Sequence, residues 1–249
     1  MMRNDKNIAL VTGSAIRIGK SIILALVREG FAVAIHYNNS ISEARSLADE
    51  INSSGGSAII VCADLSSPDE TKAIIPHINK NFGTVNLLIN NASCFINDNI
   101  SNFTTEILNK HLAINLQAAM ILSQSFINQN DKPKGNIINM LDYSVLNPPA
   151  KFLSYNISKS ALLTLTKSLA LTLAPHIRVN AIAPGPLLAN DRQNKARFEE
   201  SLRTTPLGLS TNQQEICDTV KYILATKSIT GQVITLDGGR HLDNSYEYF

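Results

Sequence analysis

The chain contains 249 residues, of which 44% are hydrophobic, and its formal net charge is only +2. Length and composition suit one globular domain with a well-buried core. The small charge, without a long block of lysine or arginine, argues against nucleic acid or an anionic membrane surface as the partner. No apolar run approaches the roughly 18 residues of a membrane span, and the first residues lack the apolar centre of a signal peptide, so the sequence predicts a cytoplasmic protein.

The three cysteines, Cys62, Cys94 and Cys217, are odd in number and far apart in the chain. This spacing favours reduced, mostly buried thiols over a disulfide framework. The sequence therefore predicts neither a disulfide nor a metal centre.

Short apolar runs rich in β-branched residues alternate with helical stretches along the chain. The runs that predict strands are Ile8–Val11, Ala32–His36, Ala58–Cys62, Val85–Asn90, Asn136–Met140, Ile177–Ile182 and Val233–Leu236. The stretches that predict helices are 17–29, 41–53, 68–81, 105–128, 154–174, 191–203 and 212–226. Strands without internal polar alternation are buried on both faces, so helices must cover both sides of a parallel sheet. The sequence thus predicts the α/β class: a doubly wound (Rossmann) parallel sheet of about seven strands.

No internal repeat, low-complexity tract or Pro/Gly-rich linker divides residues 1–249, so we expect a single domain. The longest polar stretch between a strand and the next firm helix, residues 185–210, is the predicted substrate lid. Ligands of open α/β sheets bind at the carboxyl ends of the strands, where such a lid would lie.

The first predicted strand runs into a glycine-containing loop, Thr12-Gly13-Ser14-Ala15-Ile16-Arg17-Ile18-Gly19, before the first helix begins. The backbone amides of such a loop and the N-terminus of the helix favour a phosphate group. Gly19-Lys20-Ser21 resembles the end of a nucleoside triphosphatase P-loop, but the other glycine of that motif would stand at Ser14. The dinucleotide-binding pattern G-x-G-x-x-G is not met literally either. The loop by itself therefore predicts only a phosphate-binding turn.

Tyr155 and Lys159 lie four residues apart on the predicted helix 154–174, and Asp142 lies thirteen residues before Tyr155. Side chains at positions i and i+4 share a helix face, so Lys159 can approach the Tyr155 phenol. Lowering a tyrosine pKa from about 10 to about 7 needs about 4 kcal/mol, which a lysine and a cationic nicotinamide ring together could supply. The trio predicts reductive chemistry in which a proton accompanies a hydride. The alternative is a solvated Tyr–Lys pair, with Asp142 capping the turn that follows it.

Six landmarks resemble, in order and spacing, those of the short-chain dehydrogenase/reductase family over essentially the whole chain. They are Thr12-Gly13 with Gly19, Asn90-Asn91-Ala92, Asn115, Tyr155-x-x-x-Lys159, Pro184-Gly185 and Asp237-Gly238-Gly239. The resemblance implies a nicotinamide cofactor, with Tyr155 as proton donor, Lys159 on the ribose and Asn115 supporting a proton relay. The cofactor-binding residues that it implies are Gly13, Arg17, Ile18, Gly19, His36, Tyr37, Ser40, Asp64, Leu65, Asn91, Ala92, Ser93, Tyr155, Lys159, Pro184 and Gly185.

Two replacements separate this chain from the general family pattern. Most members carry a serine where this chain has Asp142, and most have a glycine where it has Arg17. Together with Asn91-Ala92-Ser93-Cys94-Phe95, these residues resemble pteridine reductases and the related bacterial dihydromonapterin reductases. The ending Asp237-Gly238-Gly239-Arg240-His241-Leu242 resembles the latter as well.

A pterin substrate would explain why a carboxylate, Asp142, lies beside the proton donor. A carbonyl substrate needs a neutral hydroxyl donor, because an ionised carboxylate would repel the developing oxyanion. A pterin instead offers a C=N bond and an edge rich in N–H donors. We therefore expect hydride to reach C6 of a 7,8-dihydropterin while Asp142 and Tyr155 protonate N5. Phe95 would stack on the ring opposite the nicotinamide, and Ser93 and Arg17 would contact polar edges and the cofactor phosphates.

The end of the second predicted strand, His36-Tyr37-Asn38-Asn39-Ser40, bears on the choice of cofactor. An acidic residue there would bind the ribose hydroxyls and favour NADH. None is present, and Ser40, His36 and Arg17 can serve a 2′-phosphate, so the sequence predicts NADPH. Pteridine reductases often have a basic residue where Asn39 stands, which weakens this preference.

Two other functions remain open at this point. The nearer is a short-chain carbonyl reductase of the same fold, such as a 3-oxoacyl-carrier-protein reductase, which Asp142 opposes. The other is a regulatory protein that binds the nucleotide without turnover, which the intact Tyr155 and Lys159 oppose. Taken alone, Phe95 would fit core packing and Arg17 a solvated position.

The resemblance also bears on assembly. Members of the family are usually tetramers, so we expect a homotetramer that pairs through the apolar faces of helices 105–128 and 154–174. The aromatic tail, Tyr246, Tyr248 and Phe249, would pack on a neighbouring subunit.

Overall fold

A computed structural model describes residues 7–129, 134–187 and 205–242. Seven strands, each parallel to its neighbours, form one sheet in the order β3-β2-β1-β4-β5-β6-β7. The strands are β1 Ile8–Val11, β2 Ala32–Tyr37, β3 Ala58–Cys62, β4 Val85–Asn90, β5 Gly135–Met140, β6 Ile177–Pro184 and β7 Val233–Leu236. The predicted doubly wound sheet is confirmed, and every predicted strand is present.

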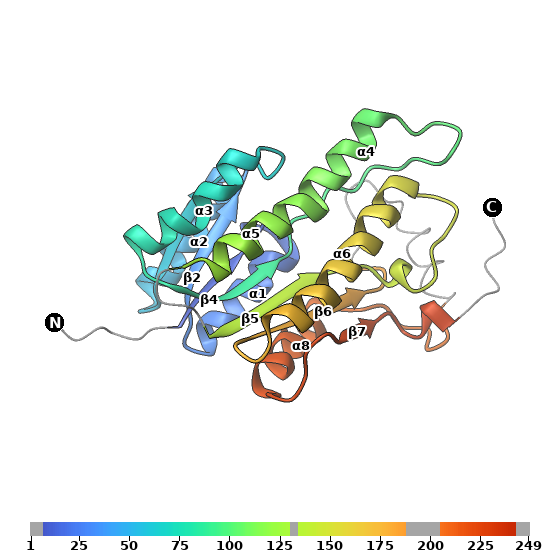
Figure 1. Ribbon diagram of the computed structural model, residues 1–249. Coiled ribbons are helices and arrows are strands. Elements are labelled where there is room, and N and C mark those ends of the chain that lie inside the picture. The colour runs from blue at the N-terminus through green and yellow to red at the C-terminus, as the bar shows by residue number, and fades with distance from the viewer. Residues whose placement is uncertain (1–6, 130–133, 188–204, 243–249) are drawn as a thin grey trace.

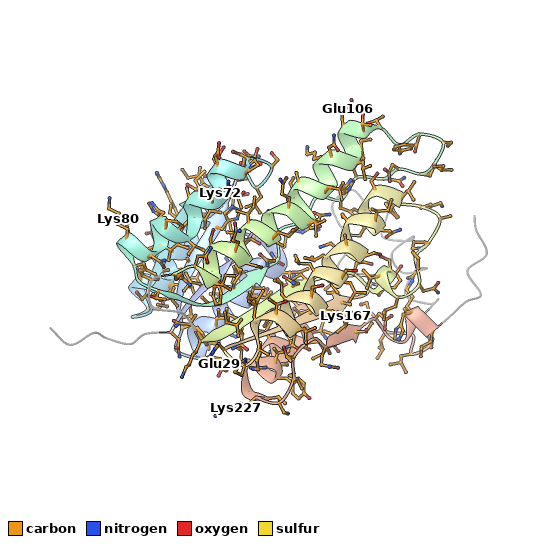
Figure 2. The ribbon with its side chains drawn as sticks, viewed as in Figure 1. Glu29, Lys72, Lys80, Glu106, Lys167 and Lys227 are labelled. Atoms are coloured by element: carbon orange, nitrogen blue, oxygen red, sulfur yellow. The ribbon has the colours of Figure 1, made fainter. Side chains whose placement is uncertain are left out.

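Helices cover both faces of the sheet (Figure 1). The helices on one face are α1 Arg17–Arg28, α2 Ile41–Ser53 and α8 Gln213–Ala225, and those on the other are α3 Pro68–Asn81, α5 Ala118–Ile127 and α6 Leu153–Leu173. Charged side chains of the helices, such as Lys80, Glu106 and Lys167, point away from the sheet (Figure 2). Across the described ranges, no helix has the length and apolarity needed to span a bilayer.

The core forms two apolar layers, one on each side of the sheet. β1 and β2 are buried at every position, as strands of a helix-covered parallel sheet must be. Ile22 and Ile23 of α1 fill one layer, and Ile74 of α3 and Phe126 of α5 fill the other. This packing fixes the strands relative to one another, so the loops at their carboxyl ends have a rigid base.

The predicted helix 105–128 is not one continuous α-helix. α4 Thr105–Leu112 passes into a π-helical turn, Ala113–Gln117, before α5 begins. Such turns insert an extra residue into the helical hydrogen-bond ladder and are frequent at functional sites. The turn contains Asn115, which is buried. The helical periodicity of the sequence does not reveal this irregularity.

The predicted lid, residues 185–210, is described only at its two ends, and the predicted helix 191–203 and the aromatic tail lie outside the described residues. Both ends are tied to the end of β7 or to the segment that follows it. Gly185 N donates to Leu236 O at 2.7 Å, and a Cβ on Gly185 would lie 2.7 Å from the Asp237 Cα. At the other end, Leu207 N donates to Gly238 O at 3.0 Å. The closing Asp-Gly-Gly segment therefore anchors this loop.

Candidate active site

The loops after β1 and β4 meet at the point where the strand order reverses, since β1 and β4 are neighbours in the sheet. Open α/β sheets bind ligands at such a point. Thr12 Oγ1 accepts from Asn91 N and Ala92 N, both at 2.9 Å. In return, Asn91 Nδ2 donates to Thr12 O at 2.8 Å and to Gly13 O at 3.2 Å. Thr12, to which the motif alone assigned no role, thus fixes one loop against the other.

Close backbone packing requires glycine at two positions of the first loop. Gly13 has a φ of +60°, and a Cβ there would lie 3.1 Å from the Ala92 Cα. A Cβ on Gly19 would lie 2.5 Å from Gly13 O and 2.6 Å from the Ser14 Cα, which is too close for any side chain. The loop therefore passes tightly over the start of α1. These residues fit the phosphates of a dinucleotide, which need a close backbone approach at a helix N-terminus.

Arg17 adopts a backbone conformation that glycine would adopt without strain. Its φ is +55°, in the left-handed region, where a side chain costs roughly 1–2 kcal/mol. This explains why glycine is the usual residue here in the family that the sequence resembles. Arg17 is exposed and begins α1. Strain of this kind is often retained where a side chain serves a site, and here it keeps a cation beside the glycine loop.

His36 lies beneath the glycine loop and is almost fully buried. Its Nδ1 accepts from Gly13 N at 3.0 Å, and its Nε2 lies 3.2 Å from Ala63 O. The ring must therefore be neutral with its proton on Nε2, and burial lowers its pKa from 6.5 to about 4. The prediction that the imidazole serves a 2′-phosphate is wrong, because both ring nitrogens are used within the protein. His36 instead supports Gly13.

Of the other predicted cofactor residues at the ends of β2 and β3, two are partly exposed and two are buried. Ser40 is the N-cap residue of α2 and is partly exposed, and its hydroxyl makes no capping bond. Asp64 Oδ1 accepts from Ser66 N at 2.8 Å and from Ser66 Oγ at 2.7 Å, and these bonds lower the pKa of Asp64. Tyr37 and Leu65 are buried. Among the predicted cofactor residues at the ends of β2 and β3, Ser40 and Asp64 are thus the partly exposed polar ones.

Asp142 makes the two interactions that the sequence left as alternatives. Tyr155 Oη donates to Asp142 Oδ2 at 3.1 Å. The other carboxylate oxygen, Oδ1, accepts from Ser144 N at 2.9 Å and caps the short 3-10 turn Tyr143–Val145. The capping bond holds the carboxylate in place, so that its second oxygen stays on the phenol.

Within the protein alone, burial opposes ionisation of Tyr155. Its phenol is buried, and burial together with the Asp142 charge raises its pKa well above the usual value. Lys159 Nζ lies 5.7 Å from the Tyr155 ring centroid and donates to Met140 O at 2.8 Å. Burial also lowers the pKa of Lys159 to about 8. Lys159 by itself therefore does not offset burial. The predicted lowering of the Tyr155 pKa also relied on the positive charge of the nicotinamide ring, and it stays a prediction.

Asn115 uses its whole side-chain amide within the protein. Its Oδ1 accepts from Cys94 N at 2.7 Å and from Ser93 Oγ at 3.2 Å. Its Nδ2 donates to Cys94 O at 3.1 Å and to Ser158 Oγ at 2.9 Å, and Ser158 Oγ donates to Tyr155 O at 2.7 Å. Asn115 thus joins the loop after β4 to the helix that carries Tyr155. Its role in a proton relay stays a prediction.

Phe95 borders the proton donor and is not a core residue. Its side chain is 51% exposed, and its ring centroid lies 4.7 Å from that of Tyr155 in an edge-on arrangement. On one face it stacks against Phe152, at a centroid distance of 4.6 Å. Phe152 was missed by sequence reasoning, although it is an aromatic residue only three positions before Tyr155. The structure thus brings two aromatic rings to the mouth of the site.

A tyrosine that holds its proton until a neighbouring atom becomes basic suits an enzyme that adds hydride and proton to a double bond. With a dinucleotide-type glycine loop at the same edge of the sheet, the fold and the site define a Rossmann-fold oxidoreductase. The family model of the short chain dehydrogenases matches residues 7–200. The chain belongs to this family, and the resemblance seen in the sequence is confirmed.

Solved structures and curated proteins include close relatives of this chain. FolM alternative dihydrofolate reductase 1 from Brucella canis, in complex with NADP, is 39% identical, with a TM-score of 0.91 over 97% of both chains. Its counterpart from Brucella suis, also in complex with NADP, is 40% identical, with the same TM-score and coverage. The 3-oxoacyl-[acyl-carrier-protein] reductase of Staphylococcus aureus is 31% identical over 94% of this chain and 98% of its own length.

Because His36 must be neutral in the folded protein, acid should destabilise the fold. The unfolded imidazole binds a proton at its ordinary pKa of 6.5, whereas the folded one does so only near 4. The free energy of unfolding should therefore fall as the pH drops through this window, by up to about 1.4 kcal/mol per pH unit. Urea denaturation at several pH values measures the slope.

The matched variant for this measurement is His36→Asn, whose amide oxygen can still accept from Gly13 N. Its unfolding free energy should depend less steeply on pH over the same window. An equal slope in both proteins would mean that other groups cause the acid sensitivity.

Proposed function

We propose that this protein is an NADPH-dependent reductase that converts a 7,8-dihydropterin into the tetrahydropterin. The observation that carries the proposal is the 3.1 Å hydrogen bond from Tyr155 Oη to Asp142 Oδ2. A carboxylate beside the proton donor suits a nitrogen heterocycle and opposes a ketone, whose developing oxyanion it would repel. The Brucella relatives, named dihydrofolate reductases, support this choice, because dihydrofolate carries a dihydropterin ring.

The residues of the site divide the reaction between them. NADPH would supply the hydride, which goes to C6 of the C=N bond. Tyr155 gives its proton to N5, and its raised pKa keeps that proton in place until N5 gains the electron pair. Asp142, bonded to the same phenol oxygen, passes a replacement proton from solvent to Tyr155. Lys159, 5.7 Å from the phenol ring centroid, provides a positive charge near the transient phenolate.

Substrate binding is assigned to the mouth of the site. The half-exposed ring of Phe95, next to Tyr155, offers a flat apolar surface for the pterin. Ser93 Oγ, bonded to Asn115 Oδ1 at 3.2 Å, lies on the same loop and offers a polar contact. Arg17, on the loop after β1, would contact the polar edge of the pterin and the phosphates of the cofactor.

NADPH is favoured over NADH by the end of β2. Residues 36–40 contain no carboxylate to bind the ribose hydroxyls. Because His36 is occupied within the protein, recognition of the 2′-phosphate is assigned to Arg17 and Ser40. Relatives solved with this cofactor support the choice, including a blue fluorescent protein from a metagenomic library in complex with NADPH, 27% identical with a TM-score of 0.88.

A second candidate is the reduction of 3-oxoacyl thioesters. The 31% identity to the Staphylococcus aureus reductase favours it. The Asp142 carboxylate opposes it, since most family members present a neutral serine at this position. The proposal for pterins therefore depends on Asp142 acting in the reaction and not only as a cap.

Two substitutions test the chemistry. Tyr155→Phe removes the proton donor and should lower kcat for a dihydropterin by a factor of about 10²–10⁴. Asp142→Ser should lower kcat/KM for the dihydropterin by at least about tenfold, while activity on an acetoacetyl thioester stays equal or rises. NADPH absorbance with dihydrobiopterin, dihydromonapterin, dihydrofolate and an oxidised pterin measures turnover.

The wild-type protein decides between the candidates in the same assay. Turnover of the acetoacetyl thioester without any turnover of the pterins would establish the carbonyl reductase. Inactivity on both classes would favour a protein that binds the nucleotide without turnover.

The cofactor assignment is tested with Arg17→Gly. Glycine relieves the positive φ, so the melting temperature should stay equal or rise. Loss of the guanidinium should raise the KM for NADPH by about tenfold and raise the KM for NADH much less. Wild-type kcat/KM should be higher with NADPH than with NADH. An equal effect of the substitution on both cofactors would contradict a role for Arg17 at the 2′-phosphate.

We also propose a homotetramer, built through the outer faces of α5 and α6. Met120 on α5 and Ile157 and Leu171 on α6 are exposed apolar side chains, and burying them between subunits would be favourable. Light scattering should give four times the chain mass for the wild type. Met120→Glu combined with Leu171→Glu should shift the protein to a smaller species, whereas a monomeric wild type would overturn the proposal.

A further inference from the structure

The segment after β4, residues 93–98, is held by side chains of α4 and of the π-helical turn that follows it. Asn115 binds the backbone of Cys94, and His111, one helical turn earlier, binds Ile96 N through Nε2 at 3.1 Å. The two helical side chains therefore hold alternate residues of the segment, Cys94 and Ile96.

The third support is Asp98, which is 1% exposed. Its Oδ1 accepts from Ser154 N at 3.1 Å, and its Oδ2 accepts from the Ser154 hydroxyl. Its backbone oxygen accepts from Phe152 N at 2.8 Å and from Leu153 N at 3.3 Å. The N-cap residue of α6, Phe152, has a φ of +63° and makes no side-chain cap, so Asp98 supplies the missing acceptors.

These bonds end next to the proton donor. Ser154, the partner of Asp98, directly precedes Tyr155 in the first turn of α6. The His111 ring is fully buried, and its centroid lies 6.1 Å from that of Tyr155. His111 Nδ1 donates to Ile107 O at 2.9 Å, which leaves Nε2 as the acceptor for the loop. The segment is thus hydrogen-bonded to the helix turns that lie next to the Tyr155 phenol.

We propose that Asp98 and His111 are positioning residues, which hold residues 93–98 at a fixed distance from the Tyr155 phenol. Ser93 and Phe95 lie on this segment, so its position decides where the substrate ring sits relative to the proton. The proposal deepens the proposed function and rests on it. If the Asp98 carboxylate only capped α6, it would stabilise the fold without affecting kcat or the KM for the substrate.

Asp98→Ala removes both carboxylate bonds, and Asp98→Asn keeps an amide oxygen for Ser154 N. The alanine variant should lower kcat by roughly tenfold to a hundredfold and raise the KM for the pterin, because small misplacements of reacting groups are costly. The Kd for NADPH should change less than about twofold, because the glycine loop is not touched. The asparagine variant should recover most of the loss, and His111→Ala should resemble Asp98→Ala.

Gln129→Ala is the matched control. Gln129 is 6% exposed and accepts from Val85 N at 2.9 Å, so it is a buried polar anchor that belongs to no part of the site. It should lower the melting temperature without changing kcat or KM. If Asp98→Ala behaves in the same way, Asp98 is only a structural cap and the proposal is overturned.

Hydrogen exchange gives a readout that does not depend on any substrate. In Asp98→Ala the amides of Cys94 and Ile96 should exchange faster together with that of Ser154, because one support of a shared segment is lost. Faster exchange at Ser154 alone would overturn the proposal. Should Asp98→Ala fail to fold, His111→Ala and Ser154→Ala take its place in both measurements.

The experiment separates this proposal from the proposed function. Kinetics are run on whichever of the dihydropterin and the acetoacetyl thioester the wild type reduces. Turnover of the thioester alone would refute the pterin assignment but would still show whether Asp98 alters kcat. If neither is reduced, the exchange at Cys94 and Ile96 decides whether the segment is held as proposed.

Discussion

One constraint governs the site: a phenol that must keep its proton is buried beside a carboxylate. Tyr155 is 7% exposed, and its hydroxyl donates to Asp142 at 3.1 Å. A buried hydroxyl without a partner would cost several kcal/mol on alkane-based scales, roughly 4–8. Asp142 removes that cost, and its own position is fixed because Ser144 N occupies its other oxygen. The phenol therefore has one well-defined orientation, set by the end of β5 and the start of α6. Proton delivery depends on that orientation.

The cofactor side of the cleft depends on backbone packing more than on charge. A Cβ on Gly19 would clash with Gly13 O, Gly13 packs tightly against Ala92 with a positive φ, and Thr12 joins the same loop to Asn91. His36 supports the loop from beneath through a neutral ring. These short contacts hold the loop in a fixed position at the N-terminus of α1. The strained backbone of Arg17 is tolerated in this setting, because its neighbours fix the turn.

The substrate side is built from segments far apart in the chain. The π-helical turn brings Asn115 inward, where its amide binds the loop after β4 and, through Ser158, the helix of Tyr155. Asp98 and His111 continue the same connection further along the loop. The two sides are joined through the loop after β4, which binds Thr12 at Asn91 and borders Tyr155 at Phe95. Substrate choice within one family fold can change through a few side chains, and the role proposed for Asp142 is of this kind.

The sequence by itself determined the layered fold, and it predicted the residues of the candidate site. Apolar runs without polar alternation predict strands buried on both faces, and the four-residue spacing of Tyr155 and Lys159 predicts a shared helix face, because both patterns follow from local backbone geometry. Only the tertiary structure decided that His36 is buried, that Lys159 donates to a strand carbonyl and that Asp98 caps α6 from 56 residues away. Those outcomes depend on which groups become neighbours after burial, and a desolvated side chain then binds the nearest partner whatever its distance along the chain.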